Sequence, residues 1–356
     1  MFSAEGYRMP AEWEPQSGVQ LTWPHAGTDW APMLDDITGT YRQMAREISC
    51  RERLLVVAPE GGAPGMLHIV CPTNDTWARD HGFITLVPSR LGNGNAAADS
   101  GHCHIGSRQS GHPKLLDFCF NGWGGKFPAD LDNAINRRIY DTGELQGEYV
   151  SQLDFVLEGG SIESDGRGTI FTTSQCLLAP HRNQPMTQEQ IEQRLKQVLG
   201  AERVVWIDHG TLTGDDTDGH IDTLVRVCPN DTLLYIGCGD RLDEQYEELQ
   251  LMEEQLHTLR TVDGRPYRLL SLPMPEPVMD EVGQRLPATY ANFLILNGAV
   301  LCPTYGQPEK DAEAMATIRR AFPDRDIVGI DSRPIIRQHG SLHCCTMQFP
   351  AGVMAQ

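Results

Sequence analysis

Three stretches of this chain repeat one pattern, and the repeat is the strongest constraint on its fold. Each has a short apolar run, a turn, a segment with helical spacing and a further apolar run, and the first runs cover residues 169–173, 232–236 and 299–303. In the first repeat, Thr187 with Gln190 predicts a capping box where the helix begins, and Gly200 predicts its end. The spacing of roughly 60 to 70 residues is too long for a solenoid unit and fits a small strand–strand–helix–strand module.

The N-terminal half follows the same pattern less clearly. One helix is expected around residues 33–48, ahead of a strand at 54–57, and another around residues 130–139, ahead of a strand at 153–157. The chain therefore holds about five like modules, and modules that cannot bury their apolar faces alone favour a closed ring around a central channel. No internal linker divides the chain, so we interpret residues 1–356 as a single domain.

Residues 90–110 interrupt the pattern, because they are rich in glycine, asparagine, serine and alanine and predict a surface insertion loop. This loop contains His102, Cys103 and His104, so a zinc or copper site is one interpretation. Alternating ligands in a Gly/Ser-rich loop, without a second anchored pair, favour solvated loop residues instead. The ten cysteines form no CxxC pair, which disfavours a structural zinc site. Because the chain shows no secretory signal, we expect reduced thiols, most of them core residues such as Cys176.

The net charge of −19 limits the partners of the protein. It disfavours nucleic acid, because no cluster of lysines and arginines offsets it, and it favours a cationic small molecule. Residues 1–6 have neither the basic nor the apolar part of a signal peptide, and no apolar run approaches the roughly 20 residues of a membrane span. We therefore predict a cytoplasmic protein without membrane contact, and a homo-oligomer stays open.

The acidic run of residues 215–222 ends in His220, Ile221 and Asp222. If the residues after Gly219 form a strand, the imidazole and the carboxylate point to the same face. A group that titrates near neutrality among several acids then indicates proton transfer on a cationic substrate. The alternative is a surface turn with a structural histidine, and this segment alone does not decide between the two.

Chemically capable residues recur at matching positions of the modules. Residues 75–80, 157–161, 218–222 and 339–344 each follow a module's long strand, and residues 288–292 are the expected fifth equivalent. In a ring, equivalent positions converge on the axis, which gathers Asp80, Glu158, His220, Asp222 and Cys344. Each alone is explained by a turn, an ion pair or core packing, but together they provide a nucleophile, an acid–base group and three carboxylates.

These segments carry a resemblance to a known family. Residues 77–80, 157–162, 216–222 and 340–344 resemble the motifs of the Porphyromonas-type peptidylarginine deiminase family, which includes the agmatine deiminases. Residues 9–15, 23–24, 120–126 and 290–293 are also similar to that family, so the resemblance spans nearly the whole chain. It implies an α/β fold, a five-bladed pseudo-symmetric propeller of strand–strand–helix–strand modules, and a deiminase catalytic domain.

The resemblance also implies a role for each residue. A guanidinium with a pKa of about 13.8 resists attack by water, so its plane must be fixed and a better nucleophile supplied. Asp80 and Asp222 are expected to hold the guanidinium nitrogens, and Cys344 to attack the central carbon. His220 is expected to protonate the departing ammonia and then to deprotonate water, while Glu158 holds its ring. No metal or organic cofactor is required.

The substrate implied is agmatine, hydrolysed to N-carbamoylputrescine and ammonia in polyamine synthesis. Asp216 is the candidate anchor for the ammonium end, with a solvated turn acid as its alternative, and Trp77 is a candidate wall for the aliphatic chain. Free or peptidyl arginine is the runner-up substrate. A cysteine amidase and a non-catalytic propeller that binds other molecules are the remaining alternatives. Cys345 is interpreted as a buried core residue, and a disulfide with Cys344 as the less favoured alternative.

Overall fold

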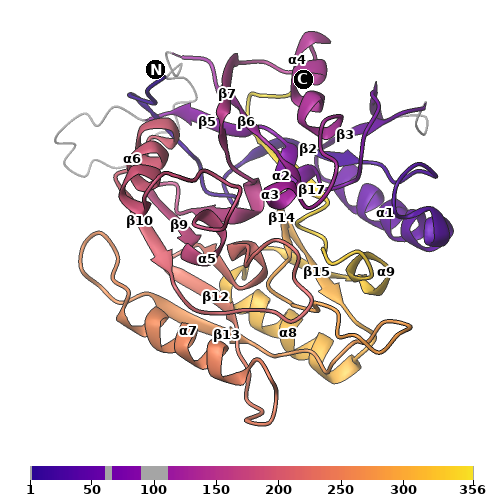
Figure 1. Cartoon of the computed structure of the whole chain (residues 1–356), viewed down its shortest axis with the longest axis vertical. Coiled ribbons are helices and arrows are strands. Elements are labelled where there is room, and N and C mark those ends of the chain that lie inside the picture. The colour runs from indigo at the N-terminus through magenta and orange to yellow at the C-terminus, as the bar shows by residue number, and fades with distance from the viewer. Residues whose placement is uncertain (1, 61–65, 90–110, 356) are drawn as a thin grey trace, which may run out of the picture.

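The chain forms a five-bladed α/β propeller. A computed structural model describes residues 2–60, 66–89 and 111–355, and within these ranges the strands form five sheets. Each sheet repeats one arrangement: an antiparallel strand pair, a helix that leads back, and a further strand parallel to the second. The predicted strand–strand–helix–strand module and the predicted fold class are confirmed. Figure 1 shows the longer helices around the outside of the molecule and the sheets between them and the centre.

The sheets are named here as blades in chain order, with their strands listed from one edge to the other. Blade 1 contains β17 (Thr346–Pro350), β2 (Gln16–Thr22), β3 (Arg53–Ala58) and β4 (Leu67–Val70). Blade 2 contains β1 (Tyr7–Arg8), β5 (Ile84–Pro88), β6 (Lys114–Cys119) and β7 (Glu148–Val156). Blade 3 contains β10 (Arg203–Ile207), β9 (Thr169–Thr173) and β8 (Ile162–Ser164). Blade 4 contains β11 (Val225–Cys228), β12 (Thr232–Ile236) and β13 (Arg268–Leu272), and blade 5 contains β14 (Leu294–Leu296), β15 (Ala299–Thr304) and β16 (Asp326–Asp331).

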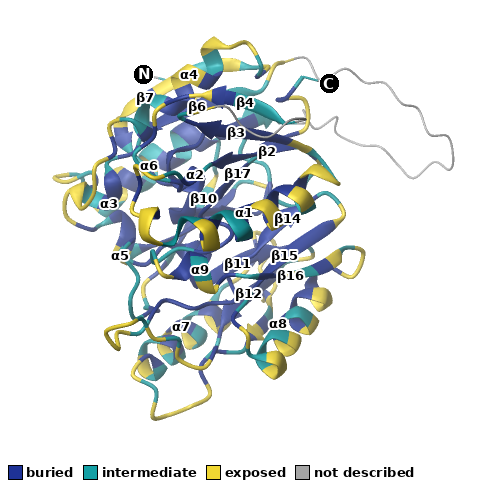
Figure 2. Cartoon of the chain, turned by 90° about the vertical axis from the view of Figure 1, so that its right-hand side faces the viewer, coloured by how far each residue is buried: buried dark blue, intermediate teal, exposed yellow. Residues whose placement is uncertain are grey.

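The longer helices lie outside the blades. In blade order they are α1 (Leu34–Ser49), α4 (Ile135–Asp141), α6 (Gln188–Leu199), α7 (Tyr246–Thr258) and α8 (Pro308–Ala321). The capping box predicted for α6 is present, and Gly200 ends that helix in the left-handed conformation. Figure 2 shows buried strands and helices whose outer faces are exposed, as expected for amphipathic helices that cover sheets. None of the described helices combines the length and the apolar run that crossing a bilayer requires.

Short helices lie in the turns and connections. The α-helical ones are α2 (Ala78–His81), α3 (Gly122–Gly125), α5 (Ser174–Leu177) and α9 (Arg333–Ile336). The 3₁₀ turns are η1 (Ala31–Met33), η2 (Asp132–Ala134), η3 (Gly159–Ser161) and η4 (Ile221–Thr223).

The two ends of the chain close the ring. The last strand, β17, pairs antiparallel with β2, so Thr346 lies opposite Leu21 and Gln348 opposite Val19. Blade 1 is therefore built from both ends of the sequence. Phe349 in β17 is fully buried and packs with Leu55 and Val57 of β3 in one apolar cluster, which holds the closure in place.

The segment at His220 is not the predicted strand. Asp218 and Gly219 have positive φ angles, and η4 follows directly, with β11 beginning only at Val225. The Asp215 carboxylate accepts hydrogen bonds from Thr217 and from the Gly219 amide. These local hydrogen bonds stabilise a turn, although the apolar alternation of the following residues favours a strand. The predicted insertion loop at residues 90–110, with His102, Cys103 and His104, lies outside the described residues.

Candidate active site

All five connections that lead from one blade to the next meet at one site. Asp80 lies in α2, between β4 and β5, and Glu158 precedes η3, between β7 and β8. His220 and Asp222 lie between β10 and β11, and Cys344 lies in the turn before β17. The fifth connection supplies Asn292, whose side-chain oxygen accepts hydrogen bonds from the Cys344 amide at 3.3 Å and the Cys344 thiol at 3.4 Å. The repeat positions recognised in the sequence therefore converge.

Gly160 marks the centre of the site. A Cβ atom at this position would lie 2.6 Å from Nδ1 of His220, 2.9 Å from Oδ1 of Asp80 and 3.1 Å from Oδ2 of Asp222. Three predicted site residues thus surround one point, and only glycine leaves them that space. The Gly160 amide also donates to Oδ1 of Asp80 at 3.1 Å, which fixes that carboxylate.

Asp80 is held by a second donor that the sequence did not indicate. Nε1 of Trp123 donates to Oδ2 of Asp80 at 2.9 Å, so residues 120–126, known only as a motif, now have a contact in the site. Nδ1 of His220 lies 3.6 Å from Oδ1 of Asp80. Burial raises the pKa of Asp80, the charge of His220 opposes this effect, and the charges of Asp222 and Glu158 add to it.

Glu158 does not hold the ring of His220 by a hydrogen bond among the described residues. It pairs instead with Arg182, whose Nε donates to Oε1 of Glu158 at 2.7 Å. Arg182 also donates to Oδ2 of Asp218 at 2.8 Å and to the carbonyl oxygen of Thr217 at 2.9 Å. Arg182 was not indicated by the sequence. It links the connection between β7 and β8, which carries Glu158, to the connection between β10 and β11, which carries His220. The role expected for Glu158 stays a prediction.

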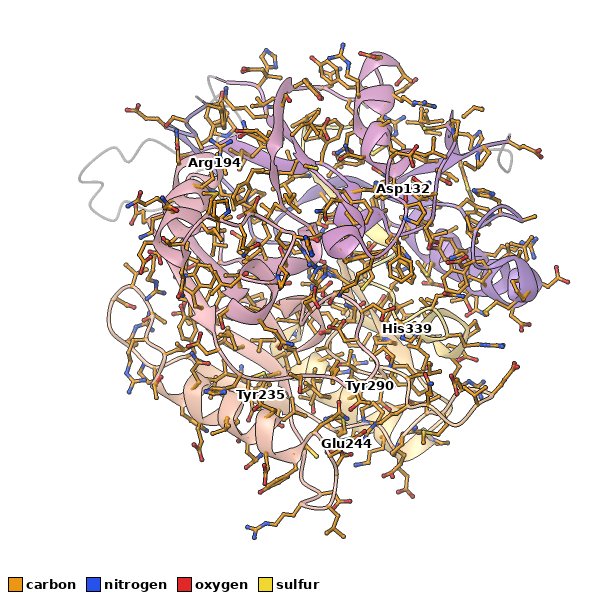
Figure 3. The ribbon with its side chains drawn as sticks, viewed as in Figure 1. Asp132, Arg194, Tyr235, Glu244, Tyr290 and His339 are labelled. Atoms are coloured by element: carbon orange, nitrogen blue, oxygen red, sulfur yellow. The ribbon has the colours of Figure 1, made fainter. Side chains whose placement is uncertain are left out.

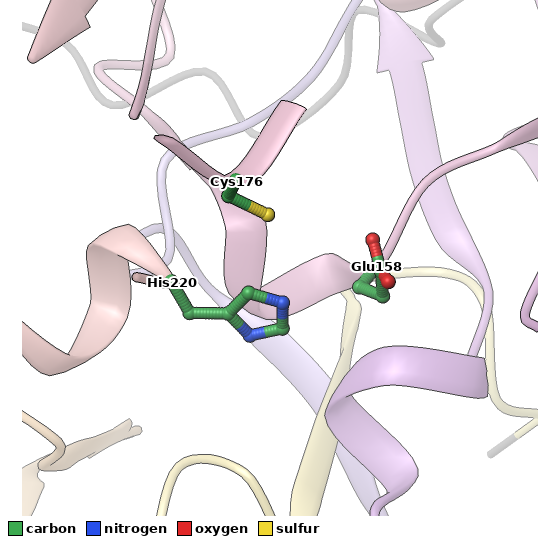
Figure 4. Close-up of side chains that lie close together, drawn as sticks. All are labelled: Glu158, Cys176 and His220. Atoms are coloured by element: carbon green, nitrogen blue, oxygen red, sulfur yellow. The ribbon is translucent and has the colours of Figure 1, made fainter. Parts of the chain in front are cut away.

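His220 has an unexpected neighbour in Cys176. Figure 4 shows His220, Glu158 and Cys176 together, and their sulfur, nitrogen and oxygen atoms all lie within 4.8 Å of one another. Burial would lower the pKa of His220, but the charge of Asp80, the Cys176 thiol and the charge of Glu158 outweigh it and raise the pKa well above its ordinary value. Cys176 is buried, as predicted, yet it also contacts the proposed acid–base group.

The nucleophile candidate is a buried thiol. Burial raises the pKa of Cys344 well above its ordinary value, and the nearby carboxylates of Asp222 and Asp80 add to this. A bound cation would offset those carboxylates and so favour the thiolate. Cys345 is buried, as predicted, and lies beside Tyr41, and both cysteines are in a turn.

A pocket leads from the surface to Cys344. Among the described residues it is lined by acids (Asp29, Asp75, Asp80 and Asp216), by aromatic rings (Trp77, Trp123 and Phe127) and by Thr217, Gln338, His339, Gly340 and Cys344. His339, labelled in Figure 3, lies between α9 and β17, with Nδ1 3.9 Å from Oδ2 of Asp216. Burial raises the pKa of Asp216, which is about half buried at the pocket wall. Asp216 and Trp77 therefore both line the pocket that contains Cys344.

Two buried acceptors in the site lack a hydrogen-bond partner among the described residues. They are Oδ1 of Asp222 and Oε2 of Glu158. Leaving such atoms unpaired is costly, and a ligand that brings several N–H donors would satisfy them.

Two sets of side chains are close enough to hold a metal ion, among the residues described. One is Glu158, Cys176 and His220, and the other is Glu12, Glu163 and His343. Each set already contains a carboxylate paired with an arginine, Arg182 in the first and Arg226 in the second. A guanidinium at that distance repels a cation, so the donor sets fit a metal poorly.

The sequence of this chain matches a family model along nearly its whole length. The model is that of the Porphyromonas-type peptidyl-arginine deiminases, and it matches residues 8–350. The chain belongs to this family. The match covers all five blades and every connection that meets at the site.

Individual relatives cover the chain from end to end. An agmatine deiminase of Medicago truncatula is 32% identical, with 97% of each chain covered. Among solved structures, a C. jejuni agmatine deiminase with substrate bound is 35% identical, covers 97% of each chain and superposes with a TM-score of 0.85. A candidate arginine deiminase from Porphyromonas gingivalis is 46% identical, covers 98% of this chain and 100% of its own, and has a TM-score of 0.87.

For a member of this deiminase family, the geometry suits a guanidino group. Asp80 and Asp222 border the same small space around Gly160, each able to accept N–H donors. The Cys344 thiol and the imidazole of His220 provide a nucleophile and a proton carrier.

Proposed function

We propose that the protein is an agmatine deiminase, which hydrolyses the guanidinium of agmatine to N-carbamoylputrescine and ammonia. The observation that carries this proposal is the charge of the pocket that leads to Cys344. Four aspartates line it, and none of the described lining residues is an arginine or a lysine. Agmatine is a dication without a carboxylate, so such a pocket attracts both its ends.

The reaction begins with placement of the guanidinium. Asp80 and Asp222 accept its N–H groups, and the unpaired Oδ1 of Asp222 gains a donor. The positive charge between the two carboxylates favours the Cys344 thiolate, so the thiol releases its proton to solvent. The thiolate attacks the central carbon and gives a neutral tetrahedral adduct. Substrate binding thus generates the nucleophile that the isolated site disfavours.

His220 carries the protons of both half-reactions. Its raised pKa means that it enters as an imidazolium, and it gives a proton to the amino group that leaves as ammonia. The carbon is then a thiouronium bound to Cys344. Neutral His220 takes a proton from water as the water oxygen attacks this carbon. The C–S bond breaks, Cys344 leaves as thiolate, and the remaining hydroxyl proton passes to ammonia or solvent.

Asp216 and Trp77 set the length of the substrate in this proposal. Trp77 packs edge-on against Trp123, with ring centroids 6.5 Å apart, and these rings form an apolar wall for four methylene groups. Asp216 then meets the ammonium at the far end. Both roles rest on the position of these residues in the pocket.

The direct test compares ammonia release from agmatine, free arginine and a blocked arginyl peptide. Agmatine is expected to be turned over best. Asp216→Asn should lower kcat/KM for agmatine about tenfold, because a hydrogen bond to a charged group contributes about 1.5 kcal/mol. The matched control is Asp324→Asn, at an exposed acid outside the pocket, which should leave kcat/KM unchanged.

Arginine is the second candidate substrate, and one observation favours it. The 46% identical P. gingivalis structure is named as a candidate arginine deiminase. An arginine site requires a cation for the α-carboxylate, so higher turnover of arginine than of agmatine would replace the first proposal. If none of the three compounds releases ammonia, the result would favour a non-catalytic propeller that binds other molecules. The cytoplasmic location, the single-domain organisation and a homo-oligomer stay predictions of the sequence.

A further inference from the structure

A buried histidine lies between two carboxylates directly behind the site. Nδ1 of His343 lies 2.7 Å from Oδ2 of Asp222, and Nε2 lies 2.8 Å from Oε2 of Glu12. The side chain of His343 is 1% exposed and that of Glu12 is 8% exposed. Glu12 comes from the N-terminal segment, 331 residues away, in a motif to which the deiminase reaction gives no role.

The chain of charges continues beyond Glu12. Nη2 of Arg226 donates to Oε2 of Glu12 at 2.8 Å, and Nε of Arg226 donates to Oε1 of Glu163 at 2.7 Å. Arg79 faces the same group from α2, with Nε donating to the His343 carbonyl oxygen at 3.4 Å. The charged groups that face His343 are thus three carboxylates and two guanidiniums.

Nε2 of His343 has two polar neighbours, Oε2 of Glu12 at 2.8 Å and Nη2 of Arg226 at 3.1 Å. The nearer one is an acceptor, so the hydrogen-bond geometry favours a proton on each ring nitrogen of His343. A nitrogen lone pair 2.8 Å from a carboxylate oxygen would be repelled, which favours a proton between Nε2 and Glu12 over a hydrogen bond from Arg226 to Nε2. The same argument applies between Nδ1 and Asp222. Burial would raise the pKa of either acid, but His343 and Arg226 outweigh it, and the pKa values of both are lowered. Arg226 is a permanent cation that lowers the pKa of both acids independently of His343, which favours the protons on the histidine.

We propose that His343 is a positioning residue, which rests on the proposed function: held as an imidazolium between Asp222 and Glu12, it keeps Asp222 ionised and presents Oδ1 of Asp222 to the guanidinium. His343 occupies Oδ2, and Oδ1 is the buried oxygen without a partner among the described residues. The carboxylate has one oxygen fixed from behind and one turned to the substrate. His343 also precedes Cys344, so the imidazolium lies one residue from the nucleophile.

A purely structural role makes different predictions. If His343 only filled space, its replacement would lower activity equally at every pH. If it keeps Asp222 ionised, its loss leaves burial as the main influence on Asp222, which then takes up a proton at higher pH. A protonated Asp222 cannot pair with a guanidinium, so the loss is largest in acid and is recovered in alkali.

The first experiment reads the protonation state without any substrate. The protein is labelled with ¹⁵N-histidine, and the resonances of His343 are assigned as those lost in His343→Asn. Both ring nitrogens of His343 are expected to carry protons at pH 7. An unprotonated ring nitrogen in the wild type at pH 7 overturns the proposal.

The second experiment measures kcat/KM for agmatine against pH in the wild type, His343→Asn and the control His209→Asn. Asparagine retains a donor for Asp222 without the charge, and His209 is half-exposed and does not line the pocket. In His343→Asn, the pH below which kcat/KM falls should rise by about one unit, so kcat/KM should be about tenfold below wild type at pH values within that fall. At pH 9 the kcat/KM of the variant should recover to within about threefold of the wild-type value. An equal loss at all pH values contradicts the proposal. Inactivity of the wild type on agmatine would refute the proposed function alone, because the ¹⁵N experiment still decides the state of His343.

Discussion

Gly160→Ala adds one methyl group at the centre of the site and removes no charge. Its Cβ would lie 2.6 Å from His220 and 2.9 Å from Asp80, where ordinary contact begins at 3.4 Å. Gly160 does not have a positive φ angle, so alanine fits its backbone conformation. The substitution therefore tests the close approach of these side chains and little else.

The expected magnitude follows from the displacement. His220 or the η3 turn must move by roughly 0.8 Å to restore normal contact. A misplacement of about 1 Å costs on the order of 100-fold in rate, equivalent to about 2.7 kcal/mol of transition-state stabilisation. Overpacking a buried site lowers the free energy of unfolding by about 1–3 kcal/mol, so the variant should still fold.

The assay is steady-state ammonia release from agmatine, with urea unfolding to establish that the variant is folded. Gly239→Ala is the matched control, because a Cβ there would meet no atom within 4 Å. It should keep the activity of the wild type. A folded Gly160→Ala variant with activity within about threefold of wild type would refute the convergence of His220, Asp80 and Asp222 on this point.

Two further predictions concern stability. Phe349→Ala should lower the free energy of unfolding in urea by about 3–5 kcal/mol, because it opens a cavity where β17 closes the ring. The control Leu242→Ala, at a residue 94% exposed, should change that free energy by less than about 0.5 kcal/mol. Equal effects of the two substitutions would contradict the closure of the ring by β17. Burial raises the pKa of Glu52 to about 7, so the folded protein retains this proton between pH 5 and 7 and loses stability as the pH rises through that range. Glu52→Gln should lose less stability from pH 5 to pH 8, and a slope identical to that of wild type would show that Glu52 does not titrate there.

The sequence was sufficient for the architecture because its signals are local. The capping box of Thr187 and Gln190 and the glycine at 200 defined α6 without any tertiary information. Apolar runs such as residues 169–173 correspond to strands, and repetition of the module implied the ring. The strand predicted after Gly219 was wrong, because the Asp215 side chain stabilises a turn that apolar alternation does not reveal.

Only the site residues that lie at equivalent positions of the repeated modules could be predicted from the sequence. Repeat register and family resemblance together named Asp80, Glu158, His220, Asp222 and Cys344, which the structure brings together. The contacts that support them connect residues without a shared position in the modules. Arg182 reaches Glu158, and Glu12 reaches His343 across 331 residues, and no pattern of spacing indicates either pair. Cys176 is a core residue, as the sequence predicted, and only the folded structure shows that it lies beside the ring of His220.

The covalent intermediate is the most direct test of the central claim. The enzyme is mixed with agmatine, quenched in acid within the first turnovers, digested and examined by mass spectrometry. The peptide that contains Cys344 is expected to carry agmatine less one ammonia, and Cys344→Ser is expected to show neither the adduct nor ammonia release. Turnover of agmatine by Cys344→Ser, or an adduct on Cys176 or Cys345 instead, would contradict the assignment of Cys344 as the nucleophile.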